Sequence, residues 1–247
     1  MAVVKMSKLI AIWGAPFSGK TTFATKLALC IYESYSSTIL ELLCQNETPA
    51  LPVLFPKRKA DELFSVGVPL SKTDITQGDV IESIVTVKQK QNLGFLGYKN
   101  GENKYTYPKY DDNKAKAFLS VLKSLADFVI VDCSSELAGL SAAAVKAADI
   151  VIRLAAPDLK SMSFFASQLP LYGDSSFKTE QHIVGLNITE NELFLPIEEC
   201  KTHYRDVSFI LPYCREVRAQ MQNGELADPV ADKKYRGMLR KIMEKVV

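Results

Sequence analysis

Apolar runs of strand length alternate with segments of helical period along most of the chain. Almost continuous apolar runs, typical of strands buried on both faces, occupy residues 8–13, 38–43, 128–132, 150–154, 182–186 and 207–211. A further strand is predicted near residues 92–98. Apolar side chains at helical spacing, such as Phe23, Leu27 and Ile31 on one face, predict helices over residues 21–35, 114–125, 138–148 and 232–247.

This alternation predicts the fold class. Successive strand–helix units join through right-handed crossovers, so we expect an α/β fold with a mostly parallel, doubly wound sheet and helices on both faces. Neither a Gly/Ser linker nor a repeat divides the 247 residues, so one domain is predicted over residues 1–247. Its most irregular part is a Lys- and Tyr-rich segment at about residues 86–113, predicted to be variable.

The stretch after the first predicted strand fits the phosphate-binding loop pattern G-x-x-x-x-G-K-[ST]. Its residues, all predicted to bind nucleotide, are Gly14, Ala15, Pro16, Phe17, Ser18, Gly19, Lys20, Thr21 and Thr22. Backbone N–H groups of such a loop and the following helix N-terminus form a polyphosphate site. Lys20 would reach the outer phosphates, and the Thr21 hydroxyl would hold Mg²⁺. The alternative is a glycine-rich turn without a ligand.

Polar residues follow several predicted strands. In a parallel sheet the carboxyl ends of the strands meet at one edge, so Gly14, Asp132, Asp158 and Asn187 should lie along one rim. Asp132 is predicted to hold a magnesium-bound water beside Thr21. A strand-end Asp that caps the next turn is the alternative.

Composition narrows the class of protein. Hydrophobic residues make up 47% of the chain, enough for a sizeable core, and the net charge of +2 does not call for a nucleic-acid or anionic-membrane partner. Neither a signal-peptide core nor a membrane-length apolar stretch is present, so a cytoplasmic protein is expected. Five cysteines without a C-x-x-C pair indicate free thiols.

Several short stretches, taken in order, resemble the ParA/MinD-type ATPases. They are 128–132 (second magnesium motif), 147–152, 156–161, 184–187 and 210–213. The resemblance implies ATP and Mg²⁺ as cofactors and an ATP-dependent homodimer. It also implies that Asn187 contacts adenine and that Pro212 and Tyr213 line the base pocket.

The chain also departs from that family. The family's first loop lysine, which crosses a dimer interface, is replaced by Ala15, and two loop glycines are replaced by Pro16 and Phe17. The carboxylates that end the family's second strand have only Glu41 as a counterpart, for which a glutamate at the edge of the core is an equal interpretation. The predicted catalytic set is therefore Lys20, Asp132 and Glu41, with slow hydrolysis because the trans lysine is missing.

Three functions are compatible with these residues. The first is an ATP-binding switch or scaffold that positions a partner complex, similar to the divergent CpaE/TadZ-like members of the family. The second is a phosphotransferase or kinase acting on a small molecule, for which residues 50–115 offer only Arg58 as a substrate or lid arginine. The third is a structural protein with a relic nucleotide site.

Two segments have alternative interpretations as partner sites. The lysines and tyrosines of residues 86–113 suit either a solvated hairpin, a partner-docking loop or a single-stranded nucleic-acid contact. The amphipathic helix over residues 232–247 suits either docking on the protein's own sheet or a membrane surface.

Overall fold

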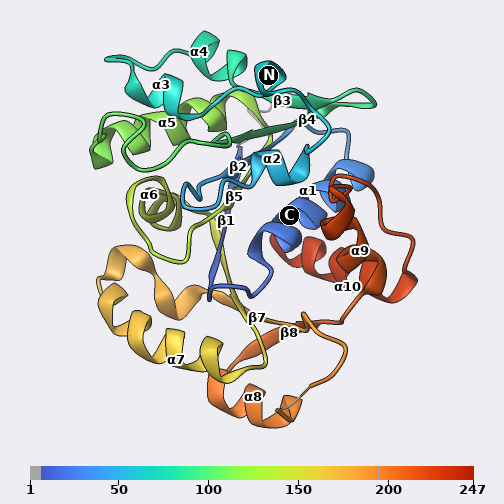
Figure 1. Ribbon diagram of the computed structural model, residues 1–247. Coiled ribbons are helices and arrows are strands. Elements are labelled where there is room, and N and C mark those ends of the chain that lie inside the picture. The colour runs from blue at the N-terminus through green and yellow to red at the C-terminus, as the bar shows by residue number, and fades with distance from the viewer. Residues whose placement is uncertain (1–6, 194) are drawn as a thin grey trace, which may run out of the picture.

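A single twisted sheet forms the centre of the computed structural model, which describes residues 7–193 and 195–247 (Figure 1). Its eight strands lie in the order β3-β4-β2-β5-β1-β6-β7-β8. The strands are β1 Lys8–Gly14, β2 Ile39–Leu43, β3 Val85–Val87, β4 Lys90–Gly97, β5 Phe128–Asp132, β6 Ile150–Ala155, β7 Ile183–Asn187 and β8 Val207–Leu211. Only β3 is antiparallel to its neighbour, β4. The predicted mostly parallel α/β sheet is therefore confirmed.

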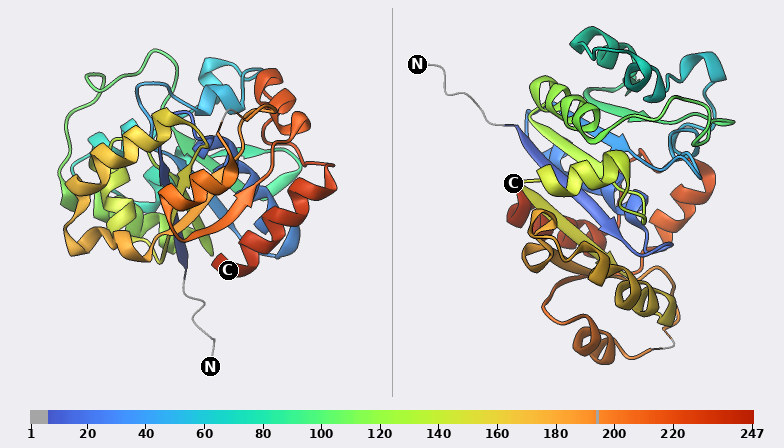
Figure 2. Two further views of the ribbon diagram at one scale, coloured as in Figure 1. Left: turned by 90° about the horizontal axis from the view of Figure 1, so that it is seen from below. Right: turned by 90° about the vertical axis from the view of Figure 1, so that its left-hand side faces the viewer.

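Helices cover both faces of this sheet (Figure 2). They are α1 Lys20–Ser34, α2 Leu51–Leu54, α3 Gly67–Ser71, α4 Gln77–Glu82, α5 Asp112–Leu125, α6 Gly139–Ala147, α7 Leu159–Gln168, α8 Ile197–Tyr204, α9 Arg215–Asn223 and α10 Lys233–Val246. Short 3₁₀ turns, η1 to η4, occupy residues 60–62, 169–172, 175–177 and 179–181. Helices α1 and α10 lie on one face, while α5, α6 and α7 lie on the other.

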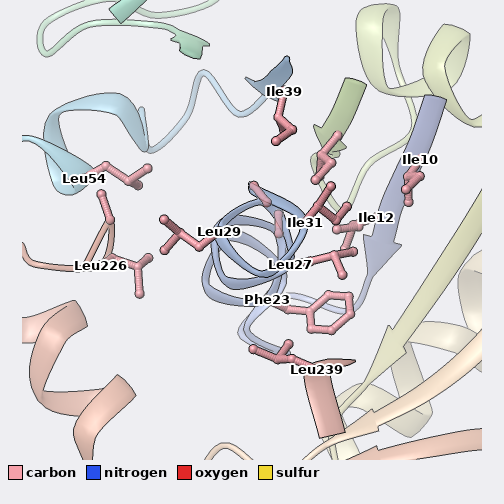
Figure 3. Packing of buried hydrophobic residues seen from close by; sticks show 14 of the residues in the cluster. Ile10, Ile12, Phe23, Leu27, Leu29, Ile31, Ile39, Leu54, Leu226 and Leu239 are labelled. Atoms are coloured by element: carbon pink, nitrogen blue, oxygen red, sulfur yellow. The ribbon is translucent and has the colours of Figure 1, made fainter. Parts of the chain in front are cut away.

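The side-chain alternation of β1 feeds two separate apolar layers. Ile10 and Ile12 point toward α1, where they meet Phe23 and Leu27 in one buried cluster (Figure 3). Leu9, Ala11 and Trp13 point to the opposite face and join a second cluster with α5, α6 and α7. Because β1 is buried on both faces, the phosphate loop that follows it starts from a rigid position.

Helix α10 packs against α1 rather than standing free. Tyr235, Leu239, Ile242 and Val246 are all buried in the cluster that contains the apolar face of α1. The side chains that a membrane contact would use are thus already covered, which favours docking on the protein's own sheet. Within the part of the chain described here, the helices are all too short or too polar to cross a bilayer.

The Lys- and Tyr-rich segment is more structured than a solvated loop. Its predicted strand is β4, found at Lys90–Gly97. Tyr98 is buried, the Tyr107 hydroxyl donates to Glu102 at 2.6 Å, and the Tyr110 hydroxyl accepts from the Leu140 N–H at 3.3 Å. Tyr98, Tyr107 and Tyr110 therefore pack into the fold, and of the four tyrosines at positions 98–110 only Tyr105 is exposed, at 79%.

Candidate nucleotide-binding site

The loop between β1 and α1 has the backbone shape that its glycines permit. A Cβ on Gly14 would lie 2.0 Å from the Leu154 carbonyl oxygen of β6, so only glycine fits there. Gly19 has φ +80° and precedes the first residue of α1. Phe17 also has positive φ, at 61°, although it is not glycine, and its side chain is 92% exposed. Such a backbone costs of order 1 kcal/mol for a non-glycine residue.

The loop presents free backbone donors. Among the residues that the structure describes, none accepts a hydrogen bond from the N–H of Gly19, Lys20 or Thr21. These groups form the N-terminus of the 15-residue helix α1, where the positive end of the helix dipole lies. Free N–H groups at a helix N-terminus are a suitable site for a phosphate group.

Lys20 is drawn back into the loop. Its Nζ donates to the Ala15 carbonyl oxygen at 2.9 Å and to Ser135 Oγ at 2.7 Å. Burial lowers the pKa of Lys20, while the nearby Asp132 carboxylate acts in the opposite direction. A phosphate placed on the loop would compete with these two oxygens for the ammonium group.

Thr21 and Asp132 meet at the mouth of the loop. Thr21 Oγ1 donates to Asp132 Oδ2 at 2.6 Å, while Asp132 Oδ1 is buried without a hydrogen-bond partner among the described residues. Burial raises the pKa of Asp132 to about 6, and both the Thr21 hydrogen bond and the Lys20 charge oppose that rise. A hydroxyl beside a carboxylate with an open oxygen supplies the hard oxygen donors that Mg²⁺ prefers. These residues therefore fit the predicted metal site.

Glu41 lies deeper in the protein than this pair. Its side chain is fully buried, Oε1 accepts from Thr25 Oγ1 at 2.8 Å, and Oε2 has no partner in the described chain. Thr25 follows Thr21 by one helical turn. Burial raises the pKa of Glu41 well above its usual range. This is the environment of a core carboxyl group, and a catalytic role for Glu41 stays a prediction.

The predicted base-contacting residues divide into two groups. Asn187 Nδ2 donates to the Ser18 carbonyl oxygen at 2.8 Å, so this amide braces the phosphate loop from β7. Pro212 and Tyr213 follow β8 and are half-buried. Asp158, expected on the same rim, caps α7 by accepting from the Ser161 N–H at 2.7 Å.

Ser135 is a further site residue, outside the predicted set. It lies in the loop after β5, with its hydroxyl on Lys20 and its carbonyl oxygen accepting from Trp13 Nε1 at 2.9 Å. Two residues later, the Leu137 N–H donates to the Tyr172 hydroxyl at 3.2 Å. Tyr172 in turn packs edge-on against Trp13, with ring centroids 5.4 Å apart. The loop after Asp132 thus connects the phosphate loop to the segment after α7.

Comparison with solved structures identifies the same architecture elsewhere. A ParA family ATPase from Chlorobium tepidum TLS is 12% identical, with coverage of 96% of this chain and 98% of that one and a TM-score of 0.71. The septum site-determining protein MinD from Pyrococcus horikoshii OT3, complexed with Mg-ADP, is 19% identical, with coverage of 98% and 96% and a TM-score of 0.68. The MinC:MinD cell division protein complex of Aquifex aeolicus is 14% identical, with coverage of 97% of both chains and a TM-score of 0.72. No protein-family model matches the chain, and no curated protein matches it in sequence.

These similarities define the class of fold. The chain has a ParA/MinD-type fold over nearly its whole length, as the sequence motifs predicted. At these levels of identity the similarity establishes the architecture, and the activity must be argued from the site itself.

Proposed function

We propose that this protein is an ATP- and Mg²⁺-binding switch or scaffold of the ParA/MinD type, which hydrolyses ATP slowly and positions a partner complex in the cytoplasm. The observation that carries the proposal is the Thr21–Asp132 pair, at 2.6 Å, beside the free N–H groups of the loop. In that pair the open oxygen of Asp132 is available to a metal-bound water. The structurally similar MinD from P. horikoshii is complexed with Mg-ADP, which supports an adenine nucleotide with Mg²⁺ as the ligand of this site.

Slow hydrolysis is supported by two side chains. Ala15, at the position where a trans-acting lysine is expected, has no exposed surface and packs in the core cluster with Trp13. Glu41, the remaining candidate to orient water, is bonded to Thr25 in the interior. A missing charge of the arginine-finger type typically costs 10³–10⁵ in rate, so a turnover below about 1 s⁻¹ is expected.

A switch requires a segment that senses the nucleotide. The loop around Ser135 is suited to this role because it shares Lys20 with the site and contacts Trp13 on the other side. Phosphate binding would remove Lys20 from Ser135, and the loop could then change the surface that a partner recognises. A protein partner is suggested by the MinC:MinD neighbour, and a homodimer is part of the same proposal.

Nucleotide affinity tests the proposal directly. Titration of ATP with Mg²⁺ should show binding to the wild type and a loss of at least tenfold in Lys20→Ala, because the ammonium group pairs with the outer phosphates. Lys116→Ala, an exposed residue of α5, is the matched control and should bind like the wild type. Equal affinity in Lys20→Ala and wild type would indicate a relic site instead.

Two further measurements separate the rival functions. Light scattering after size exclusion, with and without ATP, should show a dimer only with nucleotide, and a monomer in both states contradicts the dimer mechanism. Incubation with ATP and candidate small-molecule acceptors should produce no phosphorylated product. Such a product would favour the phosphotransferase.

A further inference from the structure

Arg153 is a charged residue placed in the middle of the sheet. It lies on β6, in register with Trp13 of β1 and Val184 of β7, and its side chain is half-buried. Across residues 7–193 and 195–247, no carboxylate lies within ion-pair distance of its guanidinium group and no acceptor is hydrogen-bonded to it. Glu180 affects it only at longer range, and burial lowers the pKa of Arg153. A half-buried guanidinium without an anion or a hydrogen-bond acceptor is costly unless a ligand supplies one.

A cavity of about 200 Å³ lies beside this guanidinium group. It is lined by Arg153, by Phe165 and Ala166 of α7, by Leu169 at the start of η2, and by His203 and Tyr204 from the end of α8. Arg153 lies over the Phe165 ring, 5.8 Å from its centroid, and Tyr204 meets Phe165 edge-on at 5.8 Å. Tyr204 is held in place because its hydroxyl donates to the Ala156 carbonyl oxygen at 2.9 Å.

The cavity is separate from the nucleotide site. The residues that line it include neither a residue of the phosphate loop nor Asp132. A ligand here would therefore not occupy the phosphate loop.

We propose that this cavity binds a small organic carboxylate with one aromatic ring or a branched hydrocarbon group. A guanidinium group offers paired N–H donors that match the two oxygens of a carboxylate. The rings of Phe165 and Tyr204 and the side chains of Ala166 and Leu169 would contact the apolar part. The cavity is open to solvent on one side, and its volume of about 200 Å³ leaves room for a ligand the size of benzoate. The proposal goes beyond the nucleotide function and does not depend on it.

Benzoate is a suitable probe, and the chain contains its own reporter. Trp13 is the single tryptophan, and its ring lies edge-on to Phe165 with centroids 5.6 Å apart. Its fluorescence is measured during titration of the full chain with benzoate and with benzamide, a neutral molecule of the same shape. The same titrations are made on Arg153→Gln, on Ala166→Phe, which narrows the cavity and keeps the arginine, and on Arg218→Gln, an exposed control on α9. Circular dichroism establishes that each variant is folded.

The expected result is a saturable response of the wild type and of Arg218→Gln to benzoate. Benzamide should bind the wild type about tenfold more weakly or worse, and benzoate should bind Arg153→Gln and Ala166→Phe more weakly by a similar factor. Benzamide and Arg153→Gln lose the hydrogen bonds between two charged groups, and Ala166→Phe loses the space for the ligand. Equal affinity of Arg153→Gln and wild type for benzoate would overturn the proposal. Equal affinity of the wild type for benzoate and benzamide would also overturn it. The same holds if the wild type shows no saturable response up to about 20 mM benzoate.

Discussion

The Asp132 carboxyl group combines a short hydrogen bond with an unused oxygen. The Thr21 hydroxyl holds Oδ2, and the buried Oδ1 has no partner in the described chain. Burial raises the pKa of this group to about 6 although Thr21 and the Lys20 charge oppose the rise, so its anionic form stays costly without a further cation. The free oxygen is thus better explained by a ligand than by stability.

Replacement of Asp132 by Asn tests this interpretation. Asn can still accept from Thr21 but brings no negative charge, so the gain in ATP affinity on adding Mg²⁺ should fall by about 10- to 100-fold. Binding of ATP without metal should change little. Titrations with and without Mg²⁺ measure both quantities, and an undiminished Mg²⁺ effect in Asp132→Asn would exclude this carboxylate as a metal-site residue.

Position 15 is buried, although a lysine that acts across a dimer interface would have to be exposed there. A lysine at this position would have to point outward to reach a second subunit, but Ala15 has no exposed surface. Introducing Ala15→Lys should therefore not restore fast hydrolysis and should lower the free energy of unfolding by about 3 kcal/mol, because a charge is forced into the core.

Urea unfolding measures that loss. Phe17→Lys is the matched control, since its side chain is 92% exposed, and it should stay within about 0.5 kcal/mol of the wild type. A stable Ala15→Lys protein with faster ATP turnover would show that the loop can turn position 15 outward.

At the level of elements, the strand–helix pattern predicted the central units best. β1, α1, β5 and β8 lie where long apolar runs or helical spacing predicted them. β3 has three residues and α2 has four, too few for a period to be recognised, so both were missed. α7, at Leu159–Gln168, was missed because polar residues interrupt its apolar face, of which Phe165 is the buried member.

The site residues likewise divide into those that the sequence predicted and those that only the structure revealed. Thr21 and Asp132 were predicted to meet because a loop motif and a strand end define both positions before any contact is known. Ser135 was not among the predicted site residues, and only the course of the loop after β5 brings its hydroxyl to Lys20 and its carbonyl oxygen to Trp13. In the sequence Arg153 is one polar residue in an apolar strand. The cavity beside it forms only where α7 and α8 pack next to β6.

The segment entering β7 carries an acid-sensitive histidine. His182 is 8% exposed, with Nε2 bonded to the Phe177 carbonyl oxygen at 2.8 Å and Nδ1 unpartnered within the described chain. Burial, assisted by the Arg153 charge, lowers the pKa of His182 to about 4. Between about pH 4 and 6.5 the unfolded chain then binds more protons than the folded one, so this residue makes stability fall as the pH falls through that range.

Unfolding at two pH values tests this expectation. From pH 7 to pH 5 the histidine should cost the wild type about 2 kcal/mol of stability. His182→Gln cannot titrate, so its stability should fall by about 2 kcal/mol less over the same interval. Parallel stability curves for the two proteins would show that the pKa of His182 is the same in the folded and unfolded chain, which contradicts the expectation.

For the whole molecule, a buried lysine ties distant parts of the chain together. Lys26 of α1 is 1% exposed, and its Nζ donates to the Leu226 and Asp228 carbonyl oxygens, both at 2.8 Å. Those oxygens belong to the connection between α9 and α10. Helix α10 then covers the apolar face of α1 in the same cluster.

Lys26→Met should uncouple this connection. The methionine fills similar space but leaves the Leu226 and Asp228 carbonyl oxygens and Gln220 Oε1 without their donor, so the free energy of unfolding should fall by about 2–4 kcal/mol. Lys116→Met, on the exposed side of α5, should stay within about 0.5 kcal/mol of the wild type. Urea denaturation compares the two variants with the wild type. Equal stability of Lys26→Met and wild type would mean that Lys26 contributes nothing to holding the α9–α10 connection on α1.

The contact between α1 and α10 has a consequence for synthesis of the protein. The phosphate-loop helix leaves the ribosome early, but residues 233–246, which cover its apolar face, are made about 200 residues later. At about 5–20 residues per second, that interval is roughly 10–40 s. During this time the nascent chain carries an uncovered apolar helix, the kind of surface that chaperones bind.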